Sequence, residues 1–464
     1  MKASSGIDLM VSLDRASAVG LRAQLEQQLR DSVRSGTLRH GAALPSTRAL
    51  ARELGVARGV VMEAYAQLTA EGYLVSSQGA PTRVAARAAA PAAAALPAEP
   101  PAPRFDFRPG APDVALVPRA ALATALRQAL RDAPDARFSY SDPRGTPELR
   151  IALATYLGRV RGVAAEPAAV MVTSGLTQGL MLTCRALAQR GVRRIAVEEP
   201  GSADLRRPVA AAGLEWVPVD VDEHGIDVDA LACADVGAVL VTPAHQYPTG
   251  VVLAPERRAA LLGWAAERGA FVLEDDYDAE YRYDRQPVGA LQGLDPQRVA
   301  YMSSISKTVA PALRVGWLVP PTALADAVER EKLADDRGTP VLTQLGLAVL
   351  LDRGELDRHV RSSRLVYRAR RDALVAALAR HLPAVGARGA AAGLHLLVDL
   401  PDGLDEDAVI AAAAARGVGL DGLRPHSARP HGPALILGYG RIAEPAIEPG
   451  VRALSAAIAA VTAS

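Results

Sequence analysis

The chain has 464 residues, of which 50% are hydrophobic and 22% charged, and its 52 basic and 51 acidic residues give a net charge of +1. At about 150 residues per domain, this length predicts two or three domains. The balanced charge excludes a protein that is basic throughout, and ordinary glycine and proline contents exclude collagen-like and wholly disordered chains. No apolar run predicts a transmembrane helix, and the start of the chain lacks the apolar core of a signal peptide.

Cysteine and lysine are both scarce. The two cysteines, Cys184 and Cys233, are too few for a disulfide framework or a four-cysteine zinc site. We therefore expect two buried free thiols, no metal, and a protein of the reducing cytoplasm. Lysine occurs only at Lys2, Lys307 and Lys332, so few side-chain amines are available to form an imine with a carbonyl cofactor.

Residues 86–104 read ARAAAPAAAALPAEPPAPR, a low-complexity segment with almost no large apolar side chain. Such a segment cannot bury a core and is typical of a semi-extended linker. It divides the chain into a head (1–85), a linker (86–104) and a large domain (105–464). The head carries ten basic and seven acidic residues, a net +3, which leaves −2 for the remainder.

The head shows three helical patterns followed by two short strands. Leucine and valine recur every fourth residue over 21–33, which predicts a first helix. A second helix begins after the N-cap candidate Ser46 and ends at Gly55, and a third extends over about 57–71. Strands at 73–75 and 82–84 flank a turn. Two helices joined by a short turn and followed by a hairpin predict a winged helix-turn-helix.

In this arrangement the third helix would enter the DNA major groove by its N-terminal end, where Arg58 lies. Arg48 at the start of the preceding helix would meet phosphate, and the wing residues Gly79 and Arg83 would approach the adjacent backbone. The alternative is a small three-helix interaction domain whose arginines are only solvated.

The run LPSTRALARELGVARGVVMEAYAQLTAEGYL resembles the winged-helix domain of the GntR family of bacterial regulators, over about residues 15–85. The resemblance implies that the partner is a double-stranded DNA operator. Where that family usually has a serine before the recognition-helix arginine, this chain has Ala57. Alanine cannot cap a helix, at a cost of about 1 kcal/mol.

After Phe105, short apolar strands alternate with helical stretches. The predicted strands are 170–172, 194–197, 238–241, 271–273 and 299–302. This alternation predicts an α/β domain with a mainly parallel sheet, whose chemistry lies in the loops at the carboxyl ends of the strands.

Those loops contain the groups that pyridoxal phosphate requires. Lys307 offers the amine for an imine, an acidic pair at Asp275 and Asp276 offers a carboxylate for the pyridine nitrogen, and Tyr277 offers a phenol for the ring oxygen. The candidate phosphate ligands are the backbone amides of Gly175, Leu176 and Thr177 with the side chains of Ser304 and Arg314. Each motif alone is also typical of a plain turn or a solvated cluster.

From about Phe107 onward, the chain resembles the fold-type I aminotransferases. The resemblance implies that Lys307 is the catalytic lysine, that Arg314 binds phosphate, and that Asp275 and Tyr277 bind the pyridine nitrogen and ring oxygen. A winged helix, a linker and an aminotransferase-like domain in this order resemble the MocR subfamily of GntR regulators. The segments FRPGAPD (107–113), HQYPTG (245–250), EDDYDAEYRY (274–283) and LILGYG (435–440) are similar to that subfamily.

Three positions depart from the aminotransferase pattern. Tyr247 replaces the usual asparagine near the ring oxygen, as in MocR proteins. Ser202 stands where an aromatic residue usually stacks on the cofactor, so another ring such as His245 would have to substitute. Ile436 stands where many aminotransferases bind the substrate carboxylate by arginine, and Arg441 is the candidate effector-binding substitute.

The resemblance favours a regulator over an enzyme. It implies a head-to-tail homodimer that holds pyridoxal phosphate and senses an amine or an amino acid. Two alternatives remain open: an active aminotransferase with an accessory DNA-binding head, or a regulator for which pyridoxal phosphate itself is the signal.

Overall fold

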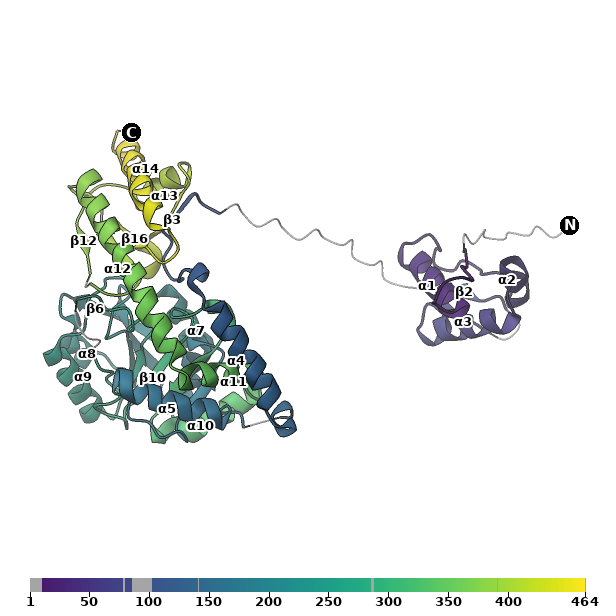
Figure 1. Ribbon diagram of the computed structural model, residues 1–464, viewed down its shortest axis with the longest axis horizontal. Helices are drawn as coiled ribbons and strands as arrows, with labels where there is room; N and C mark the ends of the chain where they lie inside the picture. Colours follow the sequence, from purple (N-terminus) through teal and green to yellow (C-terminus); the bar gives the residue numbers. More distant parts are fainter. Residues whose placement is uncertain are drawn as a thin grey trace. The chain divides into compact units, whose positions relative to one another are not determined.

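The computed structural model describes residues 11–77, 80–85, 102–140, 142–284, 288–389 and 391–463. The chain forms two compact units that divide between Pro100 and Pro101, drawn as separate ribbons in Figure 1. This division falls within the predicted linker, most of which lies outside the described residues.

The first unit is the predicted winged helix-turn-helix. Its elements are α1 (Leu21–Arg34), α2 (Thr47–Leu54), α3 (Arg58–Ala70), β1 (Leu74–Val75) and β2 (Arg83–Val84). The Ser46 hydroxyl accepts a hydrogen bond from the Ala49 amide at 3.2 Å, and Gly55 follows α2 with a φ of 64°. Ala57 precedes α3 without any side-chain cap, as the sequence predicts.

One face of each helix in this unit enters a common core. Leu25 and Leu29 of α1 pack with Leu50 of α2 and Leu68 of α3. The ion pair Arg22–Glu63 also joins α1 to α3, and Arg30–Glu71 joins α1 to the residue that follows α3. β1 and β2 pair antiparallel and form the wing.

The second unit is built on an eight-stranded mixed sheet with the order β4-β11-β10-β9-β8-β5-β6-β7. These strands are β4 (Met171–Thr173), β5 (Arg194–Glu199), β6 (Glu215–Asp222), β7 (Gly225–Ile226), β8 (Ala238–Val241), β9 (Phe271–Asp275), β10 (Val299–Ser304) and β11 (Gly316–Val319). The five central strands from β6 to β10 in this order are parallel, whereas β11 is antiparallel to both of its neighbours. The predicted fold class is confirmed, and β6, β7 and β11 are additions to the predicted strands of this sheet.

Successive side chains of a strand point to opposite faces of the sheet, so alternate residues of these strands enter two different cores. Along β11, Trp317 and Val319 face one core, which α5 and α11 complete, while Leu318 faces another, which α6, α7 and α10 complete. Helices α8 and α9 cover the sheet near β8 and β9. These helices are α5 (Pro147–Arg161), α6 (Leu176–Gln189), α7 (Ala203–Ala211), α8 (Val228–Cys233), α9 (Pro255–Arg268), α10 (Thr322–Asp335) and α11 (Val341–Asp352). Helix α4 (Arg119–Asp132) packs against α11.

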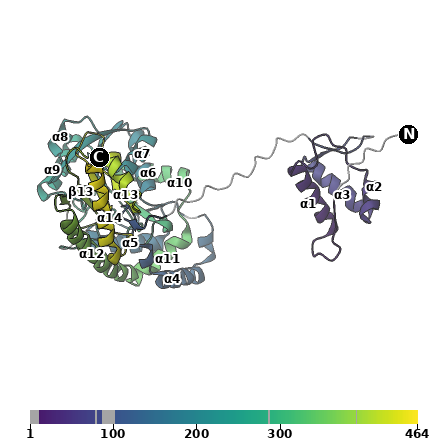
Figure 2. The ribbon, with the colours of Figure 1, turned by 90° about the horizontal axis from the view of Figure 1, so that it is seen from above.

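A smaller C-terminal part packs beside this sheet. Its four-stranded sheet has the order β12-β13-β16-β15, and a short parallel pair joins β14 to β3, the first strand after the linker. The strands are β3 (Phe105–Asp106), β12 (Ala387–Arg388), β13 (His395–Asp399), β14 (Val418–Gly419), β15 (Asp421–Gly422) and β16 (Ala434–Gly438), and the helices are α12 (Glu355–His381), α13 (Glu406–Ala414) and α14 (Glu444–Thr462). Figures 1 and 2 show α12 and α14 side by side in this part.

Burial of the two cysteines and the lack of a membrane-spanning segment are both expected from the sequence. Cys184 is a buried free thiol as expected, but Cys233 is exposed, because it is the last residue of the short surface helix α8. Within the described ranges, no helix combines the length and apolarity needed to cross a membrane.

A buried ion pair holds the end of β9. Arg161, the last residue of α5, donates to both carboxylate oxygens of Asp276 at 2.7 and 2.9 Å, and both side chains are 1% exposed. The Tyr301 hydroxyl of β10 donates to the same carboxylate at 2.7 Å. Asp276 is therefore fixed from α5 and from β10 at once.

Replacing Arg161 with methionine would leave the Asp276 carboxylate buried and unpaired. We expect a loss of about 3–5 kcal/mol in the free energy of unfolding. Urea unfolding followed by tryptophan fluorescence measures this change, because all three tryptophans lie in the large unit. The matched control is Arg159→Met, which removes an exposed ion pair with Asp357 and should cost about 1 kcal/mol or less. Equal losses for the two variants would contradict the structural role of Arg161.

Candidate functional site

A cavity of about 290 Å³ lies where the carboxyl ends of the central strands meet the C-terminal part. Each contributing strand ends in a loop that carries polar groups, as parallel sheets favour. Its lining residues include Gly110, Leu176, Thr177, Ser202, Asp204, Tyr247, Asp275, Tyr277, Asp278, Ser304, Ser306, Lys307, Arg314, His395 and His426.

Lys307 provides the amine of this cavity. It follows β10, and its ammonium donates to the carbonyl of Gly110. Burial lowers the pKa of Lys307 below its ordinary value of 10.5, which favours the neutral, nucleophilic amine. Lys332 is fully buried in an ion pair with Asp336 instead, and Lys2 lies outside the described residues.

Asp275 presents an unsatisfied carboxylate oxygen. It is the last residue of β9 and is 5% exposed, and its Oδ1 has no hydrogen-bond partner within the described part of the chain. Burial raises the pKa of Asp275 well above its ordinary value, and the neighbouring Asp276 adds to this shift. A cationic N–H donor placed at Oδ1 would offset both effects.

Tyr277 lies in the loop after β9, next to a buried histidine–carboxylate pair. Its hydroxyl donates to the carbonyl of His245 at 2.9 Å and lies 3.0 Å from Nδ1 of the same histidine. That Nδ1 is also 3.1 Å from Oδ2 of Asp278. Burial raises the pKa of Tyr277 well above 10, so the phenol keeps its proton.

Arg314 and the N-terminus of α6 meet at one turn. Arg314 reaches this turn and donates to the Ser174 carbonyl at 2.6 Å. Gly175 precedes the helix with a φ of 91°, and a Cβ at this position would lie 2.9 Å from Arg314 Nη2, so only glycine fits. The Gln178 side-chain oxygen accepts from both the Ser174 amide and the ammonium of Lys332, which fixes the turn.

The ring beside Ser202 belongs to His426. The backbone amide of Ala203, at the start of α7, donates to His426 Nδ1 at 3.3 Å, and the ring centroid lies 5.1 Å from that of Tyr247. Burial lowers the pKa of His426, so the ring is neutral with its proton on Nε2. His426 lines the cavity, whereas His245 lies behind Tyr277.

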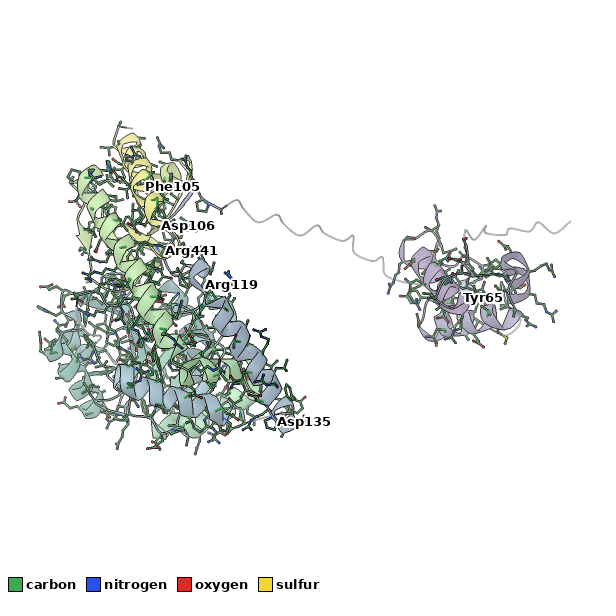
Figure 3. The ribbon with its side chains drawn as sticks, in the orientation of Figure 1. Tyr65, Phe105, Asp106, Arg119, Asp135 and Arg441 are labelled. Carbon is green, nitrogen blue, oxygen red and sulfur yellow. The ribbon has the colours of Figure 1, made fainter. Side chains whose placement is uncertain are left out.

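The cavity brings most of the predicted cofactor residues together. Leu176, Thr177, Tyr247, Asp275, Tyr277, Ser304, Lys307 and Arg314 all line it, and Gly175 supports Arg314. Arg441 does not line it: its guanidinium lies 3.4 Å from Asp106, and Figure 3 shows these two residues together. An effector-binding role for Arg441 stays a prediction. Ile436 is fully buried in β16, in an apolar cluster with Leu397 and Leu423.

Sequence reasoning missed several lining residues. His395 and His426 carry no spacing signal, because they come from the C-terminal part and meet the cavity only through tertiary packing, whereas Asp278 lies in the same predicted loop as Asp275 and Tyr277 and Asp204 lies just after Ser202. The segment FRPGAPD did contain one signal, since the Gly110 carbonyl within it accepts from Lys307.

The predicted DNA-contacting arginines lie on the surface of the head. Arg58 is the exposed first residue of α3 and donates to the Thr47 hydroxyl at 3.3 Å, and Arg48 is exposed on α2. Among the described residues neither has an acidic partner within 4 Å, unlike Arg22 and Arg30. Arg83 of the wing donates to the Gly41 carbonyl. Gly79 lies outside the described residues.

The residues present fit pyridoxal phosphate. The orphaned oxygen of Asp275 suits a pyridinium N–H, the depressed pKa of Lys307 suits imine formation, and the α6 turn with Arg314 suits a phosphate. A winged helix-turn-helix unit and a fold-type I transferase unit with this cavity define the class of the protein: a DNA-binding head fused to an aminotransferase-like domain.

Comparison with known proteins agrees with this class. The family model "Bacterial regulatory proteins, gntR family" matches residues 21–84, and "Aminotransferase class I and II" matches residues 105–418. The chain therefore belongs to the GntR-type transcriptional regulators of the MocR kind, which carry an aminotransferase class I and II domain.

Individual relatives match over nearly the full length. The chain is 36% identical to the HTH-type pyridoxine biosynthesis transcriptional regulator PdxR of Corynebacterium glutamicum, over 90% of this chain and 91% of that protein. It is 33% identical to the probable rhizopine catabolism regulatory protein MocR of Rhizobium meliloti, over 98% and 97%. Among solved structures, LysN, an α-aminoadipate aminotransferase of Thermus thermophilus complexed with N-(5'-phosphopyridoxyl)-L-leucine, superimposes with a TM-score of 0.70 at 27% identity, over 77% of this chain and 93% of that one.

A second buried acid supports the wall of the cavity. Glu198 of β5 accepts hydrogen bonds from the Thr242 amide and hydroxyl at 3.0 and 2.6 Å. Burial nevertheless raises its pKa from 4.5 to about 7. Glu198 is therefore largely protonated in the folded protein at mildly acidic pH.

This raised pKa predicts a pH-dependent stability. Below about pH 4.5 Glu198 is protonated in both the folded and the unfolded protein, and its contribution to the free energy of unfolding is complete. This contribution is lost as the pH rises through about 7, the pKa of Glu198 in the folded protein. The wild-type protein should lose free energy of unfolding between pH 5 and pH 8. We expect this loss to be smaller in Glu198→Gln, by up to about 3 kcal/mol, because glutamine does not titrate. Urea unfolding at several pH values measures it, with the exposed Glu267→Gln as the control. A Glu198→Gln protein with the wild-type pH profile would show that this group does not titrate as described.

Proposed function

We propose that this transcriptional regulator binds pyridoxal phosphate through the amine of Lys307, and that occupancy of the cavity controls how the head binds its operator. When bound, the cofactor supplies an aldehyde that exchanges between lysine and free amines. The single observation that carries the proposal is the pairing, in one cavity, of Lys307 with the buried and unpartnered Asp275 oxygen.

Each end of the cavity would bind a different part of the cofactor. Asp275 would accept the pyridinium N–H, while Tyr277 and Tyr247 would bind the ring oxygen. The α6 turn, with Leu176, Thr177, Ser304 and Arg314, would bind the phosphate. His426 would cover the ring beside Ser202. A buried carboxylate without such a cationic partner is costly, so cofactor binding supplies the charge that Asp275 lacks.

The effector would be an amine, an amino acid or pyridoxal phosphate itself. The relative from Corynebacterium glutamicum is named for the regulation of pyridoxine biosynthesis, which supports the cofactor as signal. An amine or an amino acid would act by exchange at Lys307, and Arg441 is a candidate contact for the carboxylate of an amino acid. Either ligand would shift the regulator only by binding two arrangements with different affinity, typically 1–3 kcal/mol.

A second candidate function is amino-group transfer by the same cavity. It is favoured by the intact set of Lys307, Asp275 and Tyr277. It is disfavoured by Ile436, whose side chain is buried in an apolar cluster where an aminotransferase would present a carboxylate-binding arginine. Regulation, with at most partial transfer, is therefore the proposed role.

The head would bind DNA through α3 and the wing. Arg58 at the start of α3 would read the major groove, and Arg48, Gly79 and Arg83 would contact the backbone beside it. We further propose a head-to-tail homodimer in the cytoplasm, whose two heads would occupy paired half-sites.

The cofactor proposal predicts a visible absorption that depends on Lys307. Wild-type protein mixed with pyridoxal phosphate should absorb visible light, and borohydride reduction should leave the cofactor on the peptide that contains Lys307. Lys307→Ala should show neither, whereas the control Lys2→Met, at a lysine outside the described residues, should retain both. Identical spectra for wild type and Lys307→Ala would contradict the proposal. Steady-state turnover with amino donors and 2-oxo acids, at rates typical of enzymes, would instead favour the second candidate.

The DNA-binding proposal predicts a specific role for Arg58. With a duplex selected from a random pool by the wild-type protein, Arg58→Ala should lower affinity roughly tenfold or more. If Arg58 contacts phosphate, the slope of the logarithm of the binding constant against the logarithm of the salt concentration should also become shallower by about one. Fluorescence anisotropy at several salt concentrations measures both changes. Arg22→Ala, which alters a residue paired with Glu63, is the control, and equal effects of the two variants would contradict the assignment.

A further inference from the structure

The cavity has a pair of side chains behind it that the proposed function does not use. We propose that Asp278 and His245 are positioning residues for Tyr277: Asp278 keeps a proton on His245 Nδ1, and this N–H determines whether the Tyr277 hydroxyl donates to the cofactor's ring oxygen. This inference rests on the proposed binding of pyridoxal phosphate.

Three short contacts define the arrangement. His245 Nδ1 lies 3.1 Å from Asp278 Oδ2 and 3.0 Å from the Tyr277 hydroxyl oxygen, and that hydroxyl donates to the His245 carbonyl at 2.9 Å. An ionised carboxylate only accepts hydrogen bonds, so its contact places the proton on Nδ1. Both polar contacts of Tyr277 are thus made by a single residue. Because the phenol oxygen lies within reach of the fixed Nδ1–H, it can accept a hydrogen bond there, and rotation of the phenol O–H then directs its proton away from the carbonyl and toward the cavity.

The pair is held without room to rearrange. The side chains of His245 and Asp278 are each 2% exposed. Gly393, with a φ of 68°, packs directly on them: a Cβ there would lie 2.0 Å from His245 Cε1 and 2.7 Å from Asp278 Oδ2. Any side chain at position 393 would therefore displace the pair.

A purely structural role explains the pair poorly. His245 Nε2 and Asp278 Oδ1 are both buried and have no hydrogen-bond partner within the described ranges. Unsatisfied buried polar atoms are costly, and two neutral apolar side chains would fill the same space without that cost. Native proteins tolerate such groups chiefly where they serve a site, here the phenol at the cavity wall.

Several titratable groups face His245. Tyr277 and Asp278 come from the loop after β9, His395 from β13, and Tyr247 from the loop of His245 itself, with Lys307 and Asp275 beyond Tyr277. His395 donates from Nε2 to the Pro248 carbonyl at 3.2 Å, and burial lowers its pKa well below 6.5. His395 is therefore neutral and does not repel a proton on His245.

The test is a pH titration of the visible absorption of the protein loaded with pyridoxal phosphate. A hydrogen-bond donor at the ring oxygen stabilises the deprotonated form of the lysine-bound cofactor more than the protonated form. Loss of that donor therefore raises the midpoint of the titration, the pH at which half of the bound cofactor is deprotonated. We expect Tyr277→Phe and His245→Ala each to raise it by about one pH unit. Asp278→Asn should shift it in the same direction by less. His245→Asn should stay near wild type, because the asparagine amide can replace Nδ1–H.

A double variant decides whether His245 acts through Tyr277. The midpoint of His245→Ala/Tyr277→Phe should equal that of Tyr277→Phe alone. Additive shifts, or a wild-type midpoint for His245→Ala, would overturn this inference alone. Since His245, Asp278 and His395 lie close enough to hold a metal ion, the titrations are repeated after dialysis against a chelator. If the differences in midpoint between the variants and the wild type vanish after dialysis against the chelator, the inference is also overturned. Absence of visible absorption in the wild type would overturn the cofactor proposal and this inference with it.

Discussion

The buried ion pair between Arg161 and Asp276 is the constraint on which the site depends. Asp276 directly follows Asp275, the last residue of β9, and its amide donates to the Met302 carbonyl of β10 at 2.9 Å. Its carbonyl in turn accepts from the Ser303 hydroxyl at 2.6 Å. Both the carboxylate and the backbone of Asp276 are therefore fixed to the strand that leads to Lys307. This anchoring sets how Asp275 and Lys307 face each other across the cavity.

The same constraint explains how so many acids can be buried together. Glu274, Asp275, Asp276 and Asp278 lie within five consecutive positions and all are buried. Burial raises the pKa of Glu274 to about 7 and that of Asp275 well above its ordinary value. Only Asp276 has a fully buried guanidinium as partner. Glu274 accepts from the Leu291 and Gln292 amides instead, and Asp275 and Asp278 line the cavity, where a cationic ligand group would stabilise their charge.

The sequence predicted the parts of the site that depend on local order along the chain. Lys307, Asp275 and Tyr277 were found because carboxyl ends of neighbouring parallel strands meet at one edge, so loops after successive strands converge. His395 and His426 could not be found this way, because they reach the cavity from a separate sheet whose packing has no signal in spacing. The antiparallel strand β11 was not predicted, because its four residues, Gly316–Val319, are too short an apolar run to be recognised by period alone.

The C-terminal part connects the cavity to the first strand after the linker. Glu199, at the end of β5, accepts hydrogen bonds from the amides of Ala428 and Arg429 at 2.8 and 3.2 Å, so the loop that follows His426 is tied to the large sheet. The first strand after the linker, β3, pairs with β14 of the same C-terminal part, and the Phe105 amide donates to the Gly417 carbonyl at 2.9 Å. The part that supplies His395 and His426 is thus also the part on which the linker is anchored. Under the proposed regulation, a ligand would have to bind one position of this part more tightly than another, and β3, the strand after the linker, would move with that part.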